Sequence, residues 1–385
     1  MEHKDKFMTL FALGFRPFFL GAALAGILSM LAWILTLSTG FSWPGVTDSM
    51  AWHRHEMLFG YAGGVIAGFL LTAVRNWTGK PTPSGKPLAL LVIVWAAARL
   101  SPLISSQQLI YVALDLLFWI GLFAGLWQAL SNTALRNKVF LVLVALLAGA
   151  ATLSHWHILQ PQQEHLSYLG AYLGLDLILV IMLIMGGRVI PFFIQRGLFQ
   201  AEQNRVTWVE KGLPVFLVLM LAANFFWPYS WWSAAANLVL ALWLLPNLLA
   251  WHNPRLWRNP LLWSLYLAYA WLVLGLALRG AAMLGWLSPY LGIHALTVGG
   301  LGLLTLSMMS RVSLGHTGRE LFAPQPVLLA LLIMLAAAIT RVALAPLLGL
   351  LAYQISAALW ILALLIFVLV YFPILTQPRP DGRPG

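Results

Sequence analysis

The sequence predicts an all-α polytopic membrane protein with about twelve transmembrane helices. Of its 385 residues, 61% are hydrophobic and only 9% are charged, and the mean hydropathy is +0.86. A soluble domain does not have this composition, whereas a chain made mostly of membrane-spanning helices does. Tryptophan and tyrosine gather at the ends of apolar segments, as in residues 227–232, which is the interfacial position that amphipathic rings prefer.

Twelve apolar runs of about 18 to 25 residues, joined by short connections, define the expected helices. Their approximate centres are Ile27, Ile66, Trp95, Gly121, Leu147, Val180, Leu219, Ala241, Val273, Gly302, Leu335 and Leu362. The charged N-terminal segment MEHKDK is short and leads directly into the first apolar run, so we expect no cleavable signal peptide. Residues 1–385 are therefore predicted to form a single transmembrane domain.

The basic residues predict that both termini are cytoplasmic. With that orientation, 18 of the 22 Lys and Arg lie in cytoplasmic segments, namely Lys4, Lys6, Arg16, Arg75, Lys80, Lys86, Arg136, Lys138, Arg188, Arg196, Arg205, Lys211, Arg255, Arg258, Arg311, Arg319, Arg379 and Arg383. The outward loops, such as residues 105–108 and 160–164, carry none, in agreement with the positive-inside rule. The net charge of +11 is thus a topology signal, and we expect lipids rather than nucleic acid as partners.

Two segments of the chain are related by an internal repeat. The segment from His55 to Gly79 runs in register with the segment from His294 to Gly318. Matched positions include Gly60 with Gly299, Gly63 with Gly302, and Thr78 with Thr317. A fainter third copy places Ala171 at the histidine position. This pattern predicts three four-helix units, at residues 1–136, 137–258 and 259–385. Repeated helix bundles also build transporters, so the repeat alone does not separate a redox protein from a permease.

The histidines predict a metal or haem site toward the outer face. Six of the nine are expected there, namely His53, His55, His155, His157, His165 and His294, whereas His3, His252 and His316 are expected on the cytoplasmic side. Imidazole is a common ligand of metals and of haem iron. The chain has no cysteine, which excludes thiolate sites and covalently attached c-type haem. Any haem is therefore non-covalent, and we expect it to be of the b type. The repeat pairs His55 with His294 as candidate ligands.

Helix geometry limits what the two H-x-H pairs can do. Residues two apart on a helix point away from each other, so at most one histidine of each pair should face a given site. His53 and Glu56 are three apart and share a face, which suits a carboxylate contact beside a metal. The alternative for Glu56 is a helix-start acid favoured by the helix dipole.

Arginines and acids within the apolar runs form the second set of candidates. Arg99, Arg279 and Arg341 each lie in the outer third of a predicted span, where an unpaired guanidinium is costly. One interpretation is that they hold haem propionates. The alternative is ion pairing with acids inside the protein, for which Asp115, Asp176 and Glu56 are available. Asp115 and Asp176 are also candidates for a proton route.

Four motifs add a family resemblance. They are GFRPFFLGAA from residue 14, WHRHEMLFGYAGGVIAGFLLTAVRNWTG from residue 52, GGRVIPFF from residue 186 and HALTVGGLGLLTLSMMSRVSLGHTGR from residue 294. They resemble the NnrS family of bacterial membrane proteins, and their spacing fits nearly the whole chain. The resemblance implies a plasma-membrane protein that contains haem and copper and takes part in the nitric oxide response and in resistance to nitrosative stress. It implies no residue-level ligand assignment.

Three functions remain open at this stage. The first is a haem and copper protein of the bacterial inner membrane that binds or reduces nitric oxide at an outer-side metal site, with an unidentified electron donor. The second is a non-enzymatic permease or metal-handling transporter, and the third is a haem-based nitric oxide sensor. A three-by-four helix arrangement is similar to the catalytic subunit of haem–copper oxidases, but the seventh span has no histidine pair, so a copied oxidase site is not expected.

Overall fold

The computed structural model describes residues 9–199 and 201–382, and this part of the chain contains helices and no strand. Twelve of its helical segments are long and apolar enough to cross a membrane, and each predicted centre falls within one of them. The prediction of an all-α polytopic membrane protein is therefore confirmed. The side of the membrane on which the termini lie stays a prediction.

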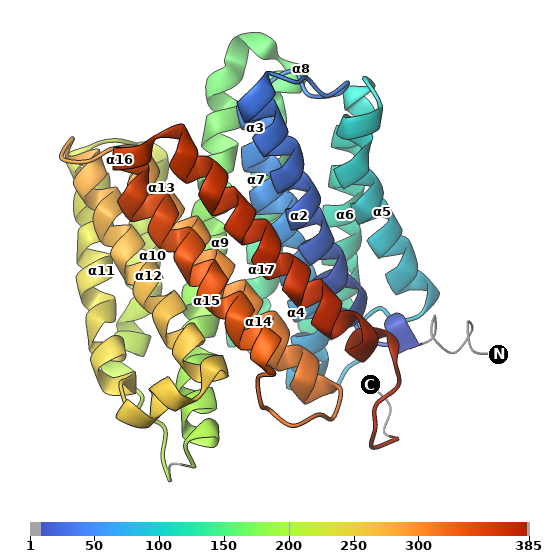
Figure 1. Ribbon diagram of the computed structural model, residues 1–385, viewed down its shortest axis with the longest axis vertical. Coiled ribbons are helices and arrows are strands. Elements are labelled where there is room, and N and C mark those ends of the chain that lie inside the picture. Colours follow the sequence, from blue (N-terminus) through green and yellow to red (C-terminus); the bar gives the residue numbers. More distant parts are fainter. Residues whose placement is uncertain (1–8, 200, 383–385) are drawn as a thin grey trace. The chain divides into compact units, whose positions relative to one another are not determined.

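Figure 1 labels the elements along the chain. The first half contains α2 (Phe15–Thr39), α3 (Ser49–His55), the π-helix η1 (Glu56–Ala62), α4 (Gly63–Thr78), α5 (Lys86–Ile104), α6 (Gln108–Leu130), α7 (Leu135–Ser154), α8 (Trp156–Leu159), η2 (Pro161–Gln163) and α9 (Glu164–Gly197). The second half contains α10 (Thr207–Phe226), α11 (Trp231–Trp251), η3 (Pro254–Arg258), α12 (Pro260–Met283), α13 (Pro289–His294), the π-helix η4 (Ala295–Gly302), α14 (Leu303–His316), α15 (Gln325–Ile339), the π-helix η5 (Thr340–Leu344), α16 (Ala345–Leu348) and α17 (Leu350–Thr376).

The helices form two compact units. The first unit contains the described residues up to Ile178, residues 311–320 and residues 364–382. The second contains Leu179–Ser310, apart from residue 200, and Leu321–Ala363. In the first unit α2 packs on α4 and η1, and α6 packs on α4, α5 and α7. In the second unit α12 packs on α11, α13 and η4, and α15 packs on η4. The three-unit repeat stays a prediction.

The two repeat-related segments share their local structure. His55 is the last residue of α3 and His294 is the last residue of α13, and a π-helix follows each of them directly. Each π-helix leads into an α-helix that is closed by a glycine in the left-handed conformation, Gly79 with φ 68° and Gly318 with φ 70°. Only glycine adopts this conformation at little cost. π-Helical turns are rare, and where they occur they are frequently at functional sites. The π-helices that follow His55 and His294 therefore make both histidines candidates for a functional site.

Two local features set the positions of the H-x-H pairs in the first unit. Asp48 caps α3 by accepting hydrogen bonds from the backbone N–H groups of Met50 and Ala51, at 2.9 and 3.0 Å, as expected of an N-cap acid. At the other pair, α7 ends at Ser154 and α8 begins at Trp156. His155 therefore lies at a break between two helices, which aims it differently from His157.

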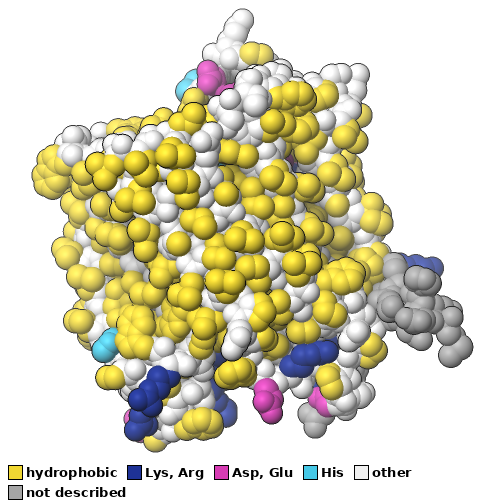
Figure 2. Space-filling view, viewed as in Figure 1, with side chains coloured by type: hydrophobic (Ala, Val, Ile, Leu, Met, Phe, Trp, Pro, Cys, Tyr) yellow, Lys and Arg dark blue, Asp and Glu magenta, His cyan; other side chains and the backbone are white. Residues whose placement is uncertain are grey.

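The outer surfaces of the helices suit a hydrocarbon environment. On α5 and α6, for example, Leu90, Ile93, Leu109 and Ile120 are all more than 50% exposed. Hydrophobic side chains cover most of the face displayed in Figure 2. In a polar solvent such a surface would be an aggregation hazard, whereas in a bilayer it is the expected surface.

The absence of cysteine allows a direct test of orientation. Gln107 lies in the connection between α5 and α6, Asn132 lies between α6 and α7, and both are exposed. We expect Gln107→Cys to react with a membrane-impermeant maleimide added to intact cells, and Asn132→Cys to react only after the membrane is opened. The unsubstituted protein, which has no cysteine to react, is the negative control. The reverse pattern would place both termini outside.

Candidate metal centre

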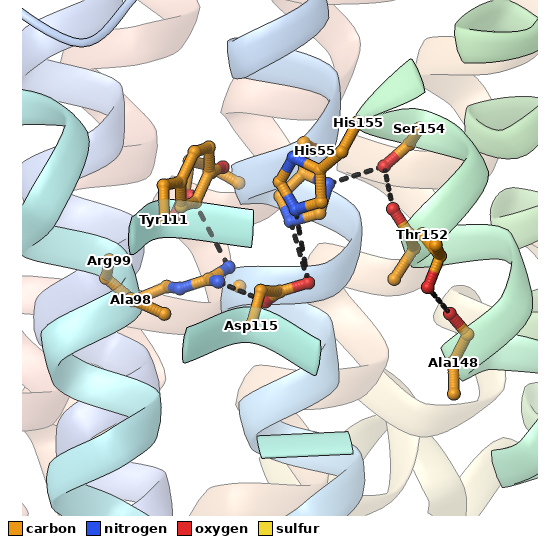
Figure 3. Close-up of polar contacts among 12 residues, drawn as sticks. His55, Ala98, Arg99, Tyr111, Asp115, Ala148, Thr152, Ser154 and His155 are labelled. Atoms are coloured by element: carbon orange, nitrogen blue, oxygen red, sulfur yellow. Dashed lines mark hydrogen bonds and ion pairs between the residues drawn. The ribbon is translucent and has the colours of Figure 1, made fainter. Parts of the chain in front are cut away.

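Three buried side chains of the first unit bring possible ligand atoms together. They are His55 at the end of α3, Asp115 on α6 and His155 at the break after α7, and their ligand atoms all lie within 4.8 Å of one another. Asp115 Oδ2 is 3.3 Å from His55 Nε2 and 3.4 Å from His155 Nε2. Figure 3 shows both imidazole rings converging on this carboxylate. Two imidazoles and a carboxylate are a ligand set found for copper, iron and zinc.

The hydrogen bonds of Ser154 determine which nitrogen of His55 carries a proton. Ser154 Oγ donates its only proton to the carbonyl of Ala151, at 2.7 Å. It also lies 2.5 Å from His55 Nδ1, so that contact requires His55 Nδ1–H to donate to Ser154 Oγ. A neutral His55 then directs the lone pair of Nε2 at Asp115 Oδ2, and two lone pairs repel. A cation between these atoms, bound by both, removes the conflict.

Two histidine nitrogen atoms at the centre also lack hydrogen bonds. Within the described residues, His55 Nε2 and His155 Nδ1 are buried and have no hydrogen-bond partner of acceptable geometry. Buried polar atoms are otherwise almost always paired, and the exceptions call for an explanation such as an ion. The ring centroids of His55 and His155 are only 3.9 Å apart. This spacing fits one shared ion, whereas a porphyrin bound to either imidazole would need open space in front of the nitrogen. The residues present therefore fit a metal ion.

A buried ion network supports Asp115 from the other side. Arg99 on α5 donates from Nη2 to Asp115 Oδ1, and its Nη1 lies 3.4 Å from Glu56 Oε1. The hydroxyl of Tyr111 donates to the same Glu56 oxygen, at 2.6 Å. All four side chains are at most 5% exposed. One guanidinium faces two carboxylates, so with both acids ionised the network has a net charge of −1, and a metal cation would supply the missing positive charge.

The glycine at position 60 makes room for this network. A Cβ atom there would lie 2.7 Å from Glu56 Oε2 and 2.8 Å from Arg99 Nη1, which is closer than such atoms approach. A side chain at position 60 would therefore displace Glu56 or Arg99 where η1 passes the guanidinium. The backbone carbonyl of Gly60 also accepts a hydrogen bond from the indole of Trp95, at 3.2 Å. The π-helix thus provides the Glu56 carboxylate, and at Gly60 it provides both the space for Arg99 and a carbonyl acceptor for Trp95.

A hydrophobic cluster adjoins the centre through Tyr111. It consists of buried Ala32, Trp52 and Tyr111 with Trp33, Trp43, Val46, Leu103 and Ile158 packed against them. The Tyr111 ring lies edge-on to His155, with centroids 4.6 Å apart. Tyr111 therefore belongs to both the hydrophobic cluster and the polar network.

The other candidates from the sequence lie in varied surroundings. His53 stacks on Trp33, with centroids 4.4 Å apart, and His157 contacts the carbonyl of Ser154 and the hydroxyl of Ser167 through Nδ1. One histidine of each H-x-H pair thus faces the centre. His294, in the second unit, donates from Nδ1 to the carbonyl of Tyr290 at 2.7 Å, and its Nε2 lies 3.0 Å from Arg341 Nη2. This arrangement turns the lone pair of His294 toward a guanidinium.

The remaining sequence candidates are not among the three possible metal ligands His55, Asp115 and His155. Asp176, on α9 of the first unit, and Arg279, on α12 of the second, are buried. His3 lies outside the described residues. His252 and His316 contact Trp257 and Phe15 respectively. Arg99 contacts Asp115 and Glu56, two of the acids considered as alternatives to propionates.

Tyr111 and Ser154 were missed by the sequence reasoning. Tyr111 is four residues before Asp115 and therefore shares its helix face, a spacing that was readable. Ser154 immediately precedes His155, but nothing in the sequence shows that it faces His55 on another helix.

Fold and site together define a multi-pass α-helical membrane protein with a buried cluster of two histidines and an aspartate among its helices. Comparison with protein-family models identifies the family. The model described as NnrS protein matches residues 9–379, and the chain belongs to the NnrS family. No curated protein matches the sequence. Family membership implies a role in the nitric oxide response and the binding of a metal or haem.

The buried network predicts a large difference between two arginine variants. Arg99→Gln leaves two buried carboxylates without their cation, so we expect the free energy of unfolding in detergent to fall by about 3 to 5 kcal/mol. Arg205→Gln breaks the exposed pair with Glu210 and should change it by less than about 1 kcal/mol. Thermal and denaturant unfolding measure both. Equal stability of the two variants would show that Arg99 does not balance these acids.

Proposed function

We propose that His55, Asp115 and His155 bind a copper ion, at which the protein captures nitric oxide. The observation that best supports this proposal is that the lone pair of His55 Nε2 faces Asp115 Oδ2. A metal cation between the two atoms would remove their repulsion. Copper and iron both accept imidazole and carboxylate ligands, and the general order of affinities for such sites favours copper(II) over iron(II). The absence of cysteine leaves nitrogen and oxygen as the main ligand atoms of this chain.

The protein groups have separate tasks in this proposal. His55 and His155 bind the ion, and Ser154 fixes the orientation of the His55 ring. Asp115 supplies a negative ligand, which Arg99 holds in place. A copper ion held by these residues would supply one-electron chemistry for a small diatomic gas. Tyr111 holds a proton on its hydroxyl beside Glu56, so any chemistry that consumes protons has a donor near the centre.

Haem takes a separate place in the proposal. The family implies haem or metal, but the contact between His55 and His155 fits an ion, and His294 directs its lone pair at Arg341. We therefore assign copper to the cluster. In the observed arrangement, none of these three histidines is assigned as a haem ligand. Haem content measured beside copper content separates the two cofactors.

The proposed location is the bacterial inner membrane. Twelve candidate spans support a multi-pass protein, and the basic segments support cytoplasmic termini. With that orientation the copper centre lies toward the outer face, beside the connection that contains Gln107. Nitric oxide is small and apolar and reaches such a buried site through the hydrocarbon region without a polar channel.

Metal content and gas binding test the proposal. The purified protein should contain about one copper ion per chain, measured by mass spectrometry, and should show an N–O stretching band when reduced and exposed to nitric oxide. His55→Ala and His155→Ala should lose both signals. His294→Ala and the exposed-site control His252→Ala should keep them.

Two outcomes would contradict the proposal. Copper retained in His55→Ala and His155→Ala would place the ion elsewhere. Copper lost with an unchanged nitric oxide band would separate the gas-binding site from the cluster. Folding is checked by the elution profile of each variant in detergent. Nitrous oxide measured with ascorbate and a mediator as electron source then shows whether the bound gas is reduced.

A further inference from the structure

The second unit contains an altered copy of the polar network in the first. In the first unit the network consists of His55, Glu56, Arg99, Tyr111 and Asp115. The repeat places His294 and Ala295 opposite His55 and Glu56, each pair spanning the junction between a short α-helix and a π-helix. Arg341 and Tyr353 have the same spacing as Arg99 and Tyr111, and Ala357 then stands where the first unit has Asp115.

The copy keeps its cation and its aromatic ring but has lost both carboxylates. Arg341 lies with its guanidinium carbon 3.8 Å from the centre of the Tyr353 ring, and its Nη2 contacts His294. Tyr353 and Ala357 are one helical turn apart on α17 and share a face, as Tyr111 and Asp115 do on α6. Both alanines are buried, at 0% exposed for Ala295 and 5% for Ala357.

No acid of the second unit replaces these carboxylates. The sequence of this unit contains two acidic residues, Glu202 and Glu210, and Glu210 pairs with Arg205. Within the described residues Arg341 has no ion pair. Arg99 shows that a guanidinium at this position pairs with two carboxylates when the chain provides them. A guanidinium held within the membrane without a counter-charge is costly, so a charge from outside the chain has a strong reason to bind.

We propose that Arg341, His294 and Tyr353 form a binding site for a planar anion with two oxygen atoms. A guanidinium pairs with such an anion through two parallel hydrogen bonds, and a buried alanine stands at each position where the first unit has a carboxylate. A free oxyanion such as nitrite and the carboxylate of an organic molecule share this chemistry. The site is independent of the proposed copper centre, because none of its residues belongs to the first unit.

Restoring the lost carboxylate provides the sharpest test. Purified full-length protein is titrated with sodium nitrite by calorimetry, and organic compounds that copurify with it are extracted and identified by mass spectrometry. Wild-type protein should bind one of these anions. Arg341→Gln and Ala357→Asp should weaken that binding by at least about tenfold, or about 1.4 kcal/mol, the first by removing the cation and the second by pairing with it. Ala357→Asn, which adds the same volume without charge, is the matched control and should bind more tightly than Ala357→Asp.

The two sources of the anion give different results. Saturable nitrite binding that depends on Arg341 identifies a free oxyanion. A copurifying carboxylate compound that is absent from Arg341→Gln and Ala357→Asp identifies an organic ligand. The inference is wrong if wild-type protein binds neither, or if all variants that elute as folded protein bind equally. His55→Ala, which removes a proposed copper ligand, should leave anion binding unchanged, so failure of the copper proposal is distinguishable from failure of this one.

Discussion

The pairing of Arg99 with Asp115 and Glu56 is the constraint on which the polar interior of the first unit depends. Three ionisable groups lie buried on helices that face hydrocarbon on their other sides. None is tolerable alone, because burial of an unpaired charge costs far more than a helix gains from one packed side chain. Several other features follow from this pairing. Gly60 is small because Arg99 and Glu56 occupy the adjacent space, and Tyr111 donates to Glu56 because that carboxylate needs a further partner.

The same network explains why a metal ion fits here. Arg99 compensates for one carboxylate and leaves one negative charge within the network when both acids are ionised. His55 and His155 bring neutral nitrogen ligands to the far side of Asp115, and Ser154 fixes the tautomer of His55 so that its free nitrogen faces the carboxylate. The negative charge of the network, the imidazole and carboxylate donors and the orientation of the His55 ring thus all favour the binding of a cation. Comparison with the second unit supports this account, because there the acids are absent and His294 faces a guanidinium instead.

Sequence reasoning predicted the helices well and the centre only in part. Long apolar runs are decided locally by hydropathy, so all twelve predicted centres lie within candidate spans. The convergence of His55, Asp115 and His155 depends on how α3, α6 and the end of α7 pack, and no spacing in the sequence encodes that packing. The repeat instead drew attention to His294 as the counterpart of His55. Asp115 was considered a partner of Arg99 or part of a proton route, but its contact with two histidines was not foreseen. Helical geometry alone did indicate that at most one histidine of each H-x-H pair would face a given site.

The central claim is that one ion is bound by two imidazoles and a carboxylate. X-ray absorption spectroscopy at the copper edge of the purified protein tests it most directly, because the method reports the type of ligand atom and its distance. The account predicts two nitrogen ligands of imidazole at about 2.0 Å and an oxygen ligand at a similar distance, typical of such donors, and a spectrum of His155→Ala that has lost one imidazole. A copper ion bound mainly by sulfur of methionine, or a spectrum unchanged by His155→Ala, would contradict it.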